Sequence, residues 1–110
     1  MKAAVLALGL VAMPAQAEVI ECPAKHQGVP LLGASVFEGP QKQYELIGER
    51  KEVRGGQDVY FILGADKMTW IACWYKPDAP VWYRVRPGAT RCEVQKRGAP
   101  GQVAVKVSCR

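Results

Sequence analysis

Alternation between apolar and polar residues is clearest in the second half of the chain. Valine holds every second position of Val103, Val105 and Val107, and polar or small residues stand between them. This period of two is typical of strands that bury one face. Proline- and glycine-rich turns separate the apolar stretches. The pattern predicts a mainly β fold, a small antiparallel meander that forms a sheet, sandwich or barrel, with strands over 68–75, 81–86, 91–96 and 102–109.

The first half of the chain is less regular. Residues 31–38 predict a strand that Gly39-Pro40 ends, and 58–63, rich in β-branched and aromatic residues, predict a buried strand. The stretch 43–53 also contains good helix formers, but its loose alternation favours a strand. Two prolines and a glycine within 22–30 indicate an extended segment that leads into the first strand.

The period of two assigns two faces to the strands of the second half. One face is apolar and includes three of the four cysteines. The other face collects all three tryptophans and several arginines. The inward residues are Ile71, Cys73, Tyr75, Val81, Tyr83, Val85, Cys92, Val94, Val103, Val105, Val107 and Cys109. The outward residues include Trp70, Trp74, Trp82, Arg84, Arg86, Arg91 and Arg97.

The N-terminus has the features of a secretory signal peptide. Lys2 supplies a positive charge, an uncharged apolar run covers 3–13, and Ala15-Gln16-Ala17 offers small residues at a cleavage site. The run is shorter than the roughly 20 residues of a membrane-spanning helix. Glu21 precedes Cys22 where lipid attachment needs a small residue. We expect cleavage after Ala17 and a single small β domain over 18–110, located in the periplasm or secreted.

The four cysteines all lie beyond the predicted cleavage site. An even number in a short exported chain indicates two disulfides. Three pairings are possible, and we favour the nested one, Cys22–Cys109 with Cys73–Cys92, in which one bond joins the chain ends and the other closes the meander. A zinc site is not expected, because no pair has C-x-x-C spacing and His26 is the only histidine.

Charge and aromatic residues together indicate a binding surface. The net charge is +5, and residues 84–110 carry seven basic groups against Glu93 alone. Tryptophan beside arginine can bind flat or anionic groups. The predicted binding residues are Trp74, Trp82, Arg84, Arg86 and Arg91. The alternative is that Trp70 and Trp74 belong to the core and that the arginines only solvate the sheet.

The sequence offers little for catalysis. His26 lies in a segment rich in proline and glycine, and among the candidate nucleophiles only Ser35 is near it in the sequence. We expect no catalytic residues, no cofactor and no metal. Nucleic acid is also not expected, because no recognised binding module is present. An acidic protein or an anionic polymer of the cell envelope is the better candidate partner.

Several residues resemble a family of small exported proteobacterial proteins that is named after a Salmonella locus and has no established activity. They are Cys22-Pro23, Val36 to Pro40, Leu46, the Trp-x-x-Cys-x-Tyr run of Trp70 to Tyr75, and the Cys-x-Val of Cys92 to Val94. One departure is Ile47, where the family pattern has a proline. The resemblance implies a periplasmic location and a Cys73–Cys92 bond, and no mechanism.

These observations favour a non-enzymatic binding protein, inhibitor-like or immunity-like, because a rigid β domain loses little entropy on binding. The turn 76–80, stiffened by Pro77 and Pro80, is a candidate inserting element. A structural or accessory envelope component without a dedicated ligand is the second interpretation. An enzyme of unrecognised type is the third.

Overall fold

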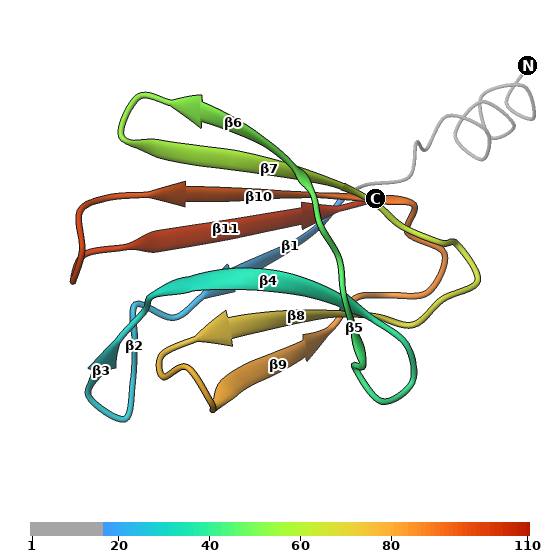
Figure 1. Cartoon of the computed structure of the whole chain (residues 1–110), viewed down its shortest axis with the longest axis horizontal. Coiled ribbons are helices and arrows are strands. Elements are labelled where there is room, and N and C mark those ends of the chain that lie inside the picture. The colour runs from blue at the N-terminus through green and yellow to red at the C-terminus, as the bar shows by residue number, and fades with distance from the viewer. Residues whose placement is uncertain (1–16) are drawn as a thin grey trace, which may run out of the picture.

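A computed structural model describes residues 17–110, which form an all-β protein (Figure 1). The predicted signal peptide, apart from Ala17, lies outside the described residues. Within 17–110 no helix is long and apolar enough to cross a membrane. The strands are β1 (Glu18–Cys22), β2 (Lys25–His26), β3 (Val29–Pro30), β4 (Gly33–Glu38), β5 (Tyr44–Glu45), β6 (Glu49–Val53), β7 (Gly56–Ile62), β8 (Thr69–Trp74), β9 (Pro80–Arg84), β10 (Arg91–Arg97) and β11 (Ala104–Cys109).

The strands form two antiparallel sheets that pack into a sandwich (Figure 1). The five-stranded sheet has the order β1-β11-β10-β7-β6, and the four-stranded sheet has the order β5-β4-β8-β9. A small β2-β3 hairpin stands apart from both. The core draws on both sheets: Val94 and Val107 come from one, Val36 and Ile71 from the other, and each is at most 4% exposed. The predicted mainly β fold is confirmed, in its sandwich form.

The predicted strands of the second half are all present, and their inward faces are those that the alternation assigns. Val103, Val105 and Val107 are buried, while the residues between them are exposed. Val81 and Tyr83 are partly buried and pack against the core. Alternation is a local property of each strand, so the sequence alone was sufficient to assign it.

The order of pairing differs from a simple meander. β8 pairs with β9, and β10 pairs with β11, but β9 and β10 lie in different sheets. The chain therefore crosses the sandwich between Arg84 and Arg91. It also crosses within the stretch predicted as one strand over 43–53, which is divided into β5 and β6. At that crossing Leu46 donates its backbone N–H to Val36 and packs against the core, while Ile47 is 99% exposed.

The N-terminal segment contains strands that the sequence analysis did not predict. β1 pairs with β11 at the edge of the five-stranded sheet. The next residues form the β2-β3 hairpin, whose turn residues Gln27 and Gly28 have φ values of 50° and 79°. Two consecutive positive φ values are characteristic of the type I′ turn, which suits the twist of short hairpins. The prolines of this segment are compatible with its short edge strands.

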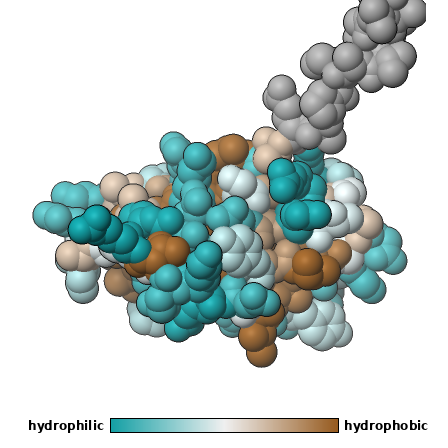
Figure 2. Space-filling view, turned by 90° about the horizontal axis from the view of Figure 1, so that it is seen from above, coloured by the Kyte–Doolittle hydropathy of each residue, from teal (hydrophilic) through white to brown (hydrophobic). Residues whose placement is uncertain are grey.

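The outer edge at β6 is strongly charged. Four consecutive residues, Glu49 to Glu52, are exposed. Charged side chains on an edge strand oppose pairing with another chain. The side of the molecule on which β6 and β7 lie is largely hydrophilic, and its hydrophobic patches are separate from one another (Figure 2).

All four cysteines form disulfides, but the predicted pairing is wrong. The bonds are Cys22–Cys73 and Cys92–Cys109. Although β1 pairs with β11, Cys22 lies opposite Val105, and Cys109 lies opposite Glu18. The two cysteine positions are therefore four residues apart along the strands, about 13 Å between Cα atoms, which is more than a disulfide can bridge. The Cys73–Cys92 bond was expected because it would close the meander and because the family resemblance implies it. It is also incorrect, since Cys92 lies directly opposite Cys109 and is bonded to it.

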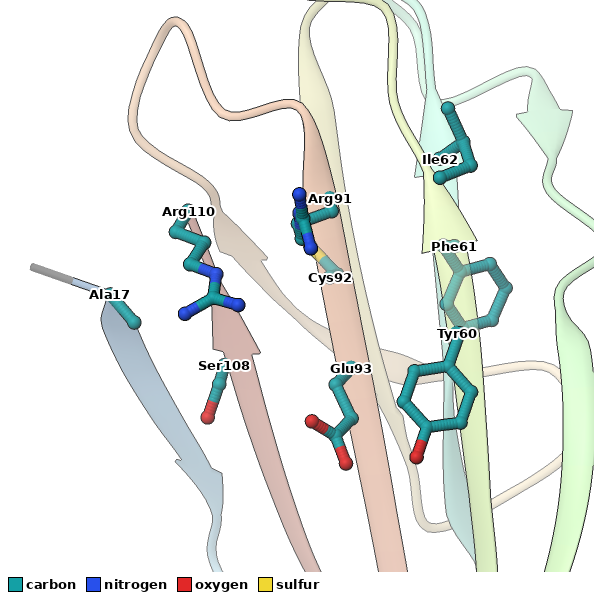
Figure 3. A pocket seen from close by; sticks show the side chains of 9 residues that line it. All are labelled: Ala17, Tyr60, Phe61, Ile62, Arg91, Cys92, Glu93, Ser108 and Arg110. Carbon is teal, nitrogen blue, oxygen red and sulfur yellow. The ribbon is translucent and has the colours of Figure 1, made fainter. Parts of the chain in front are cut away.

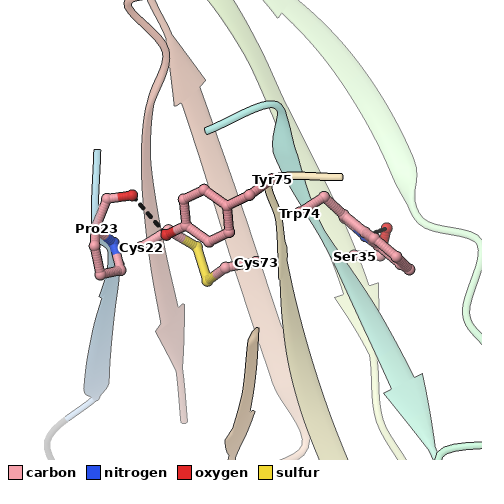
Figure 4. The surroundings of a disulfide bond; sticks show 6 residues. All are labelled: Cys22, Pro23, Ser35, Cys73, Trp74 and Tyr75. Carbon is pink, nitrogen blue, oxygen red and sulfur yellow. Dashed lines mark hydrogen bonds between the residues drawn. A yellow bond between two sulfur atoms is a disulfide. The ribbon is translucent and has the colours of Figure 1, made fainter. Parts of the chain in front are cut away.

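The Cys22–Cys73 bond connects the two sheets, since Cys22 belongs to β1 and Cys73 to β8. Next to it, the hydroxyl of Tyr75 donates a hydrogen bond of 2.6 Å to the carbonyl oxygen of Pro23 (Figure 4). Tyr75 is 4% exposed, and burial raises the pKa of its phenol above the usual 10, with a smaller contribution from Tyr83. A covalent bond and a hydrogen bond thus hold the same two segments together.

We expect the two disulfides to contribute unequally to stability. Their sequence separations are 51 and 17 residues. In the chain-entropy model these loops correspond to about 4 and about 3 kcal/mol. The double variant Cys22→Ala/Cys73→Ala should therefore unfold at lower urea concentration than Cys92→Ala/Cys109→Ala. Peptide mapping under non-reducing conditions checks the pairing directly, and a Cys22–Cys109 peptide would contradict it.

Replacing Tyr75 with phenylalanine removes the hydrogen bond to Pro23 and should lower the free energy of unfolding by about 1 kcal/mol at neutral pH. Because folding raises the pKa of this phenol, the neutral form is favoured in the folded state. The contribution of the neutral phenol to the free energy of unfolding is complete below the unfolded-state pKa of about 10, and it is lost as the pH rises through the folded-state pKa. The stability gap between wild type and Tyr75→Phe should therefore narrow above pH 10 in urea titrations. A gap that widens there would contradict this assignment.

Candidate binding surface

The three tryptophans lie on the outer face of the four-stranded sheet. Trp70 and Trp74 stand on β8, on the side opposite to the buried Ile71 and Cys73. Pairing with the neighbouring strands places Phe37 and Arg84 opposite Trp70. We call the six side chains gathered here the aromatic–basic surface: Phe37, Lys42, Trp70, Trp74, Trp82 and Arg84.

Ring contacts hold the aromatic residues of this surface together. The ring of Phe37 meets Trp82 edge to face, with 5.1 Å between centroids, and lies 6.4 Å from Trp74. Such pairs add about 0.5–1.5 kcal/mol each beyond area burial. Ala72, which lies between Trp70 and Trp74 on the same face, is 0% exposed. The aromatic side chains thus form a second apolar cluster outside the core of the sandwich.

Hydrogen bonds fix two of the three indoles. Trp70 donates its Nε1–H to the carbonyl oxygen of Gly39 at 2.8 Å, and Trp74 donates to Ser35 Oγ at 3.0 Å (Figure 4). Within residues 17–110 the indole N–H of Trp82 has no such partner. All three tryptophans are half-buried. Trp82 is therefore the indole best able to donate a hydrogen bond to a bound molecule.

Two cations lie over these rings. Lys42 Nζ is 4.4 Å from the centroid of Trp70 and 5.4 Å from that of Trp82, and the Arg84 guanidinium is 5.3 Å from Trp70. Lys42 reaches this position from the loop after β4, where its backbone has a φ of 57°. Sequence analysis missed Lys42, because nothing in the local pattern shows that this loop folds back over the sheet.

The structure brings together only part of the predicted site. Trp74, Trp82 and Arg84 share the outer face of the four-stranded sheet. Arg86 follows β9, and its backbone N–H donates to the carboxylate of Glu18 at 2.8 Å. Arg91 lies on β10 in the other sheet.

The expectation of one shared face is therefore wrong for Arg91, and also for Arg97, which forms a 2.8 Å ion pair with Asp58 on the five-stranded sheet. The cause is the crossing between β9 and β10. Alternation assigns a residue to an inner or an outer face but does not say which sheet carries it. The alternative that Trp70 and Trp74 are core residues is also excluded, since neither belongs to the core of the sandwich.

A shallow groove of about 400 Å³ adjoins the aromatic–basic surface at Trp74. Its walls are mostly apolar, and Leu32 among them is 50% exposed. The turn between β8 and β9, which the sequence marked as a candidate inserting element, contributes Pro77. The turn thus borders the groove. Its lining residues are Leu32, Gly33, Ala34, Ser35, Glu45, Trp74 and Pro77.

His26 borders a small cavity of about 160 Å³ together with Tyr75 and Lys76. Its ring lies 5.4 Å from that of Tyr75, and it stands in the exposed β2-β3 hairpin. Across residues 17–110, no three histidine, cysteine or acidic side chains are placed to hold a metal ion.

Lys42 should stabilise the aromatic–basic surface through its contact with Trp70. Exposed cation–π pairs contribute about 0.5–1 kcal/mol. We expect Lys42→Met to lower the free energy of unfolding by that amount. A double-mutant cycle with Trp70→Leu should show that the effects of the two substitutions are coupled. Lys51→Met, on the charged edge strand β6, serves as the matched control and should leave stability unchanged. Urea unfolding measures the four proteins of the cycle and the control, and zero coupling between positions 42 and 70 would refute the contact.

Comparisons with protein-family models, with curated proteins and with solved structures find no match for this chain. The family resemblance therefore remains a prediction. Function has to be inferred from the aromatic–basic surface itself.

Proposed function

We propose that this protein is a non-enzymatic binding protein of the cell envelope that recognises an acidic protein through its aromatic–basic surface. The observation that supports this most directly is the placement of two cations over tryptophan rings on the outside of a sheet. No other described element covers this face as a second layer (Figure 1). An inhibitor-like or immunity-like role would suit a rigid domain of this kind.

The composition of the surface matches that of protein-binding hot spots. Tryptophan, tyrosine and arginine dominate such hot spots, in well-packed centres surrounded by less important contacts. Here the indoles of Trp70 and Trp74 are already fixed by hydrogen bonds, so they lose little freedom on binding. The free indole N–H of Trp82 and the exposed guanidinium of Arg84 would supply directed contacts.

Charge and shape favour an acidic protein partner over a regular polymer. Lys42 and Arg84 give the surface positive charge, which speeds encounter with an acidic partner. The adjoining groove at Trp74 is mainly apolar and has room for a side chain, with Leu32 and Pro77 on its walls and Glu45 as its one charged lining residue. An apolar groove beside cations fits a protein surface that mixes apolar and acidic residues.

The disulfides support the envelope as the place of action. Two disulfides are compatible with an oxidising, exported compartment. This supports the predicted signal peptide over 1–17 and a periplasmic or secreted location.

The test begins with chemical cross-linking and capture from periplasmic extract, followed by affinity measurement with the purified captured protein. Arg84→Glu reverses the charge of an exposed side chain and removes its contact with the Trp70 ring, while the contacts of Phe37 with Trp74 and Trp82 remain. We expect it to weaken binding by roughly 30-fold or more, as loss of a hot spot does. Arg54→Glu, in the exposed turn before β7, makes the same chemical change away from the surface and should not affect affinity.

A second variant separates the aromatic contribution from that of charge. Trp82→Ala should weaken binding to the same partner, whereas Ile47→Ala, at a fully exposed position, should not. Circular dichroism verifies that each variant is folded. The proposal fails if Arg84→Glu and Trp82→Ala both retain wild-type affinity. It also fails if the captured partner is an anionic polymer, or if nothing is captured, as expected for a structural component.

A further inference from the structure

Two arginines lie directly opposite each other on the five-stranded sheet. The backbone N–H of Arg91 donates to the carbonyl oxygen of Arg110 at 3.0 Å, and the N–H of Arg110 donates to Arg91 at 2.9 Å. These reciprocal bonds define a hydrogen-bonded pair of antiparallel strands. Since the neighbouring Cys92 and Cys109 point into the core, both arginines point outward (Figure 3).

This arrangement is electrostatically unfavourable without a bound anion. Like charges directly opposite on one face of a sheet destabilise it. Within residues 17–110 neither guanidinium has a carboxylate within ion-pair distance, in contrast to Arg97, which is paired with Asp58. Both side chains are exposed. An anion that bridges the two guanidinium groups would remove the repulsion.

The pair borders a cavity of about 410 Å³ (Figure 3). Ile62, which lies opposite Arg91 on β7, is 85% exposed and provides an apolar wall. Ser108, beside Arg110, contributes a hydroxyl group (Figure 3). Positive charge, a hydroxyl group and an exposed apolar side chain therefore meet at one place.

Tyr60 and Glu93 also line this cavity, and Glu93 lies directly opposite Ser108. Desolvation, the charges of Glu93 and Asp58, and a hydrogen bond with Glu93 all raise the pKa of Tyr60, outweighing the lowering effect of Arg97. The phenol therefore stays neutral. Glu93 also accepts a 3.3 Å hydrogen bond from Gln95. Its negative charge disfavours an anion beside it and so directs the anionic group of a ligand toward the two arginines.

We infer that Arg91 and Arg110 form a binding site for a tetrahedral oxyanion, the phosphate or sulfate group of an ester whose apolar part lies against Ile62. A guanidinium binds two oxygens as a planar fork. A carboxylate offers two oxygens in one plane, whereas a tetrahedral oxyanion offers oxygens in several directions. A tetrahedral group therefore has enough oxygens for both arginines, at the end of the cavity away from Glu93. This site lies on the opposite sheet from the aromatic–basic surface and is independent of the function proposed above.

Thermal unfolding of the full protein tests the site. The probes are inorganic phosphate, an alkyl monophosphate and sodium chloride at matched ionic strength. A ligand at ten times its Kd should raise the Tm by roughly 5–10 °C. We expect the alkyl monophosphate to reach this shift at lower concentration than phosphate, and chloride to have a much smaller effect. Equal shifts with phosphate and chloride would show general screening and overturn the inference.

Substitutions test whether the phosphate-specific shift in Tm arises from Arg91 and Arg110. Arg91→Gln and Arg110→Gln should each abolish the phosphate-specific shift, whereas Arg54→Gln, an exposed arginine remote from the cavity, should keep it. Ile62→Ser should remove the advantage of the alkyl ester over inorganic phosphate. Retention of the full shift in both Arg91→Gln and Arg110→Gln would refute the site. Amide chemical shifts on titration provide a second measurement that does not depend on stability.

Vesicles distinguish the two sources of such an ester. Sedimentation with vesicles that contain phosphatidic acid, compared with vesicles of phosphatidylcholine alone, reports on a lipid headgroup. Binding to the first kind only, lost in Arg91→Gln, supports a lipid ligand. Binding to the soluble ester without binding to either vesicle supports a small-molecule ligand. Failure of all phosphate probes overturns the inference and leaves the proposed protein-binding function untouched.

Discussion

The Cys22–Cys73 disulfide fixes the relation between the two sheets, and the rest of the structure depends on it. Cys73 lies on the inner side of β8, between residues whose side chains point outward. Because side chains alternate along a strand, a bond that anchors β8 from inside the sandwich also sets the position of Trp74 on the outside. The Tyr75–Pro23 hydrogen bond acts on the same segments. The disulfide thus fixes the position of β8, which carries core residues on its inner side and residues of the aromatic–basic surface on its outer side.

The sequence could predict the strands of the second half and the side that each residue faces, because both depend on neighbours in the chain. Val103, Val105 and Val107 are examples in which local alternation suffices. It could not predict which strands pair, because β9 and β10 have the same pattern whether they lie in one sheet or in two. The disulfide pairing failed for that reason. Lys42 shows another limit, since its place over Trp70 depends on a loop that folds back from β4.

The two proposed sites use the outer faces of opposite sheets. The aromatic–basic surface combines fixed rings with cations that are already engaged in ring contacts. The pair Arg91 and Arg110 instead leaves two guanidinium groups on one face without an ion-pair partner among the described residues. One surface is preorganised by its internal contacts, and the other retains unfavourable charge until an anion arrives. Occupancy of either surface leaves the other accessible.

The crossings between the sheets also determine how the protein can fold. Each sheet contains strands that are distant in the chain, as in the pairing of β4 with β8 and of β7 with β10. Contacts between such distant strands give the topology a high contact order. Because the chain loses entropy when it closes these long loops, we expect the protein to fold slowly for its size. The five-stranded sheet needs both ends of the described chain, because β1 pairs with β11. A nascent polypeptide therefore completes its native fold only after the last strands, β10 and β11, have been synthesised.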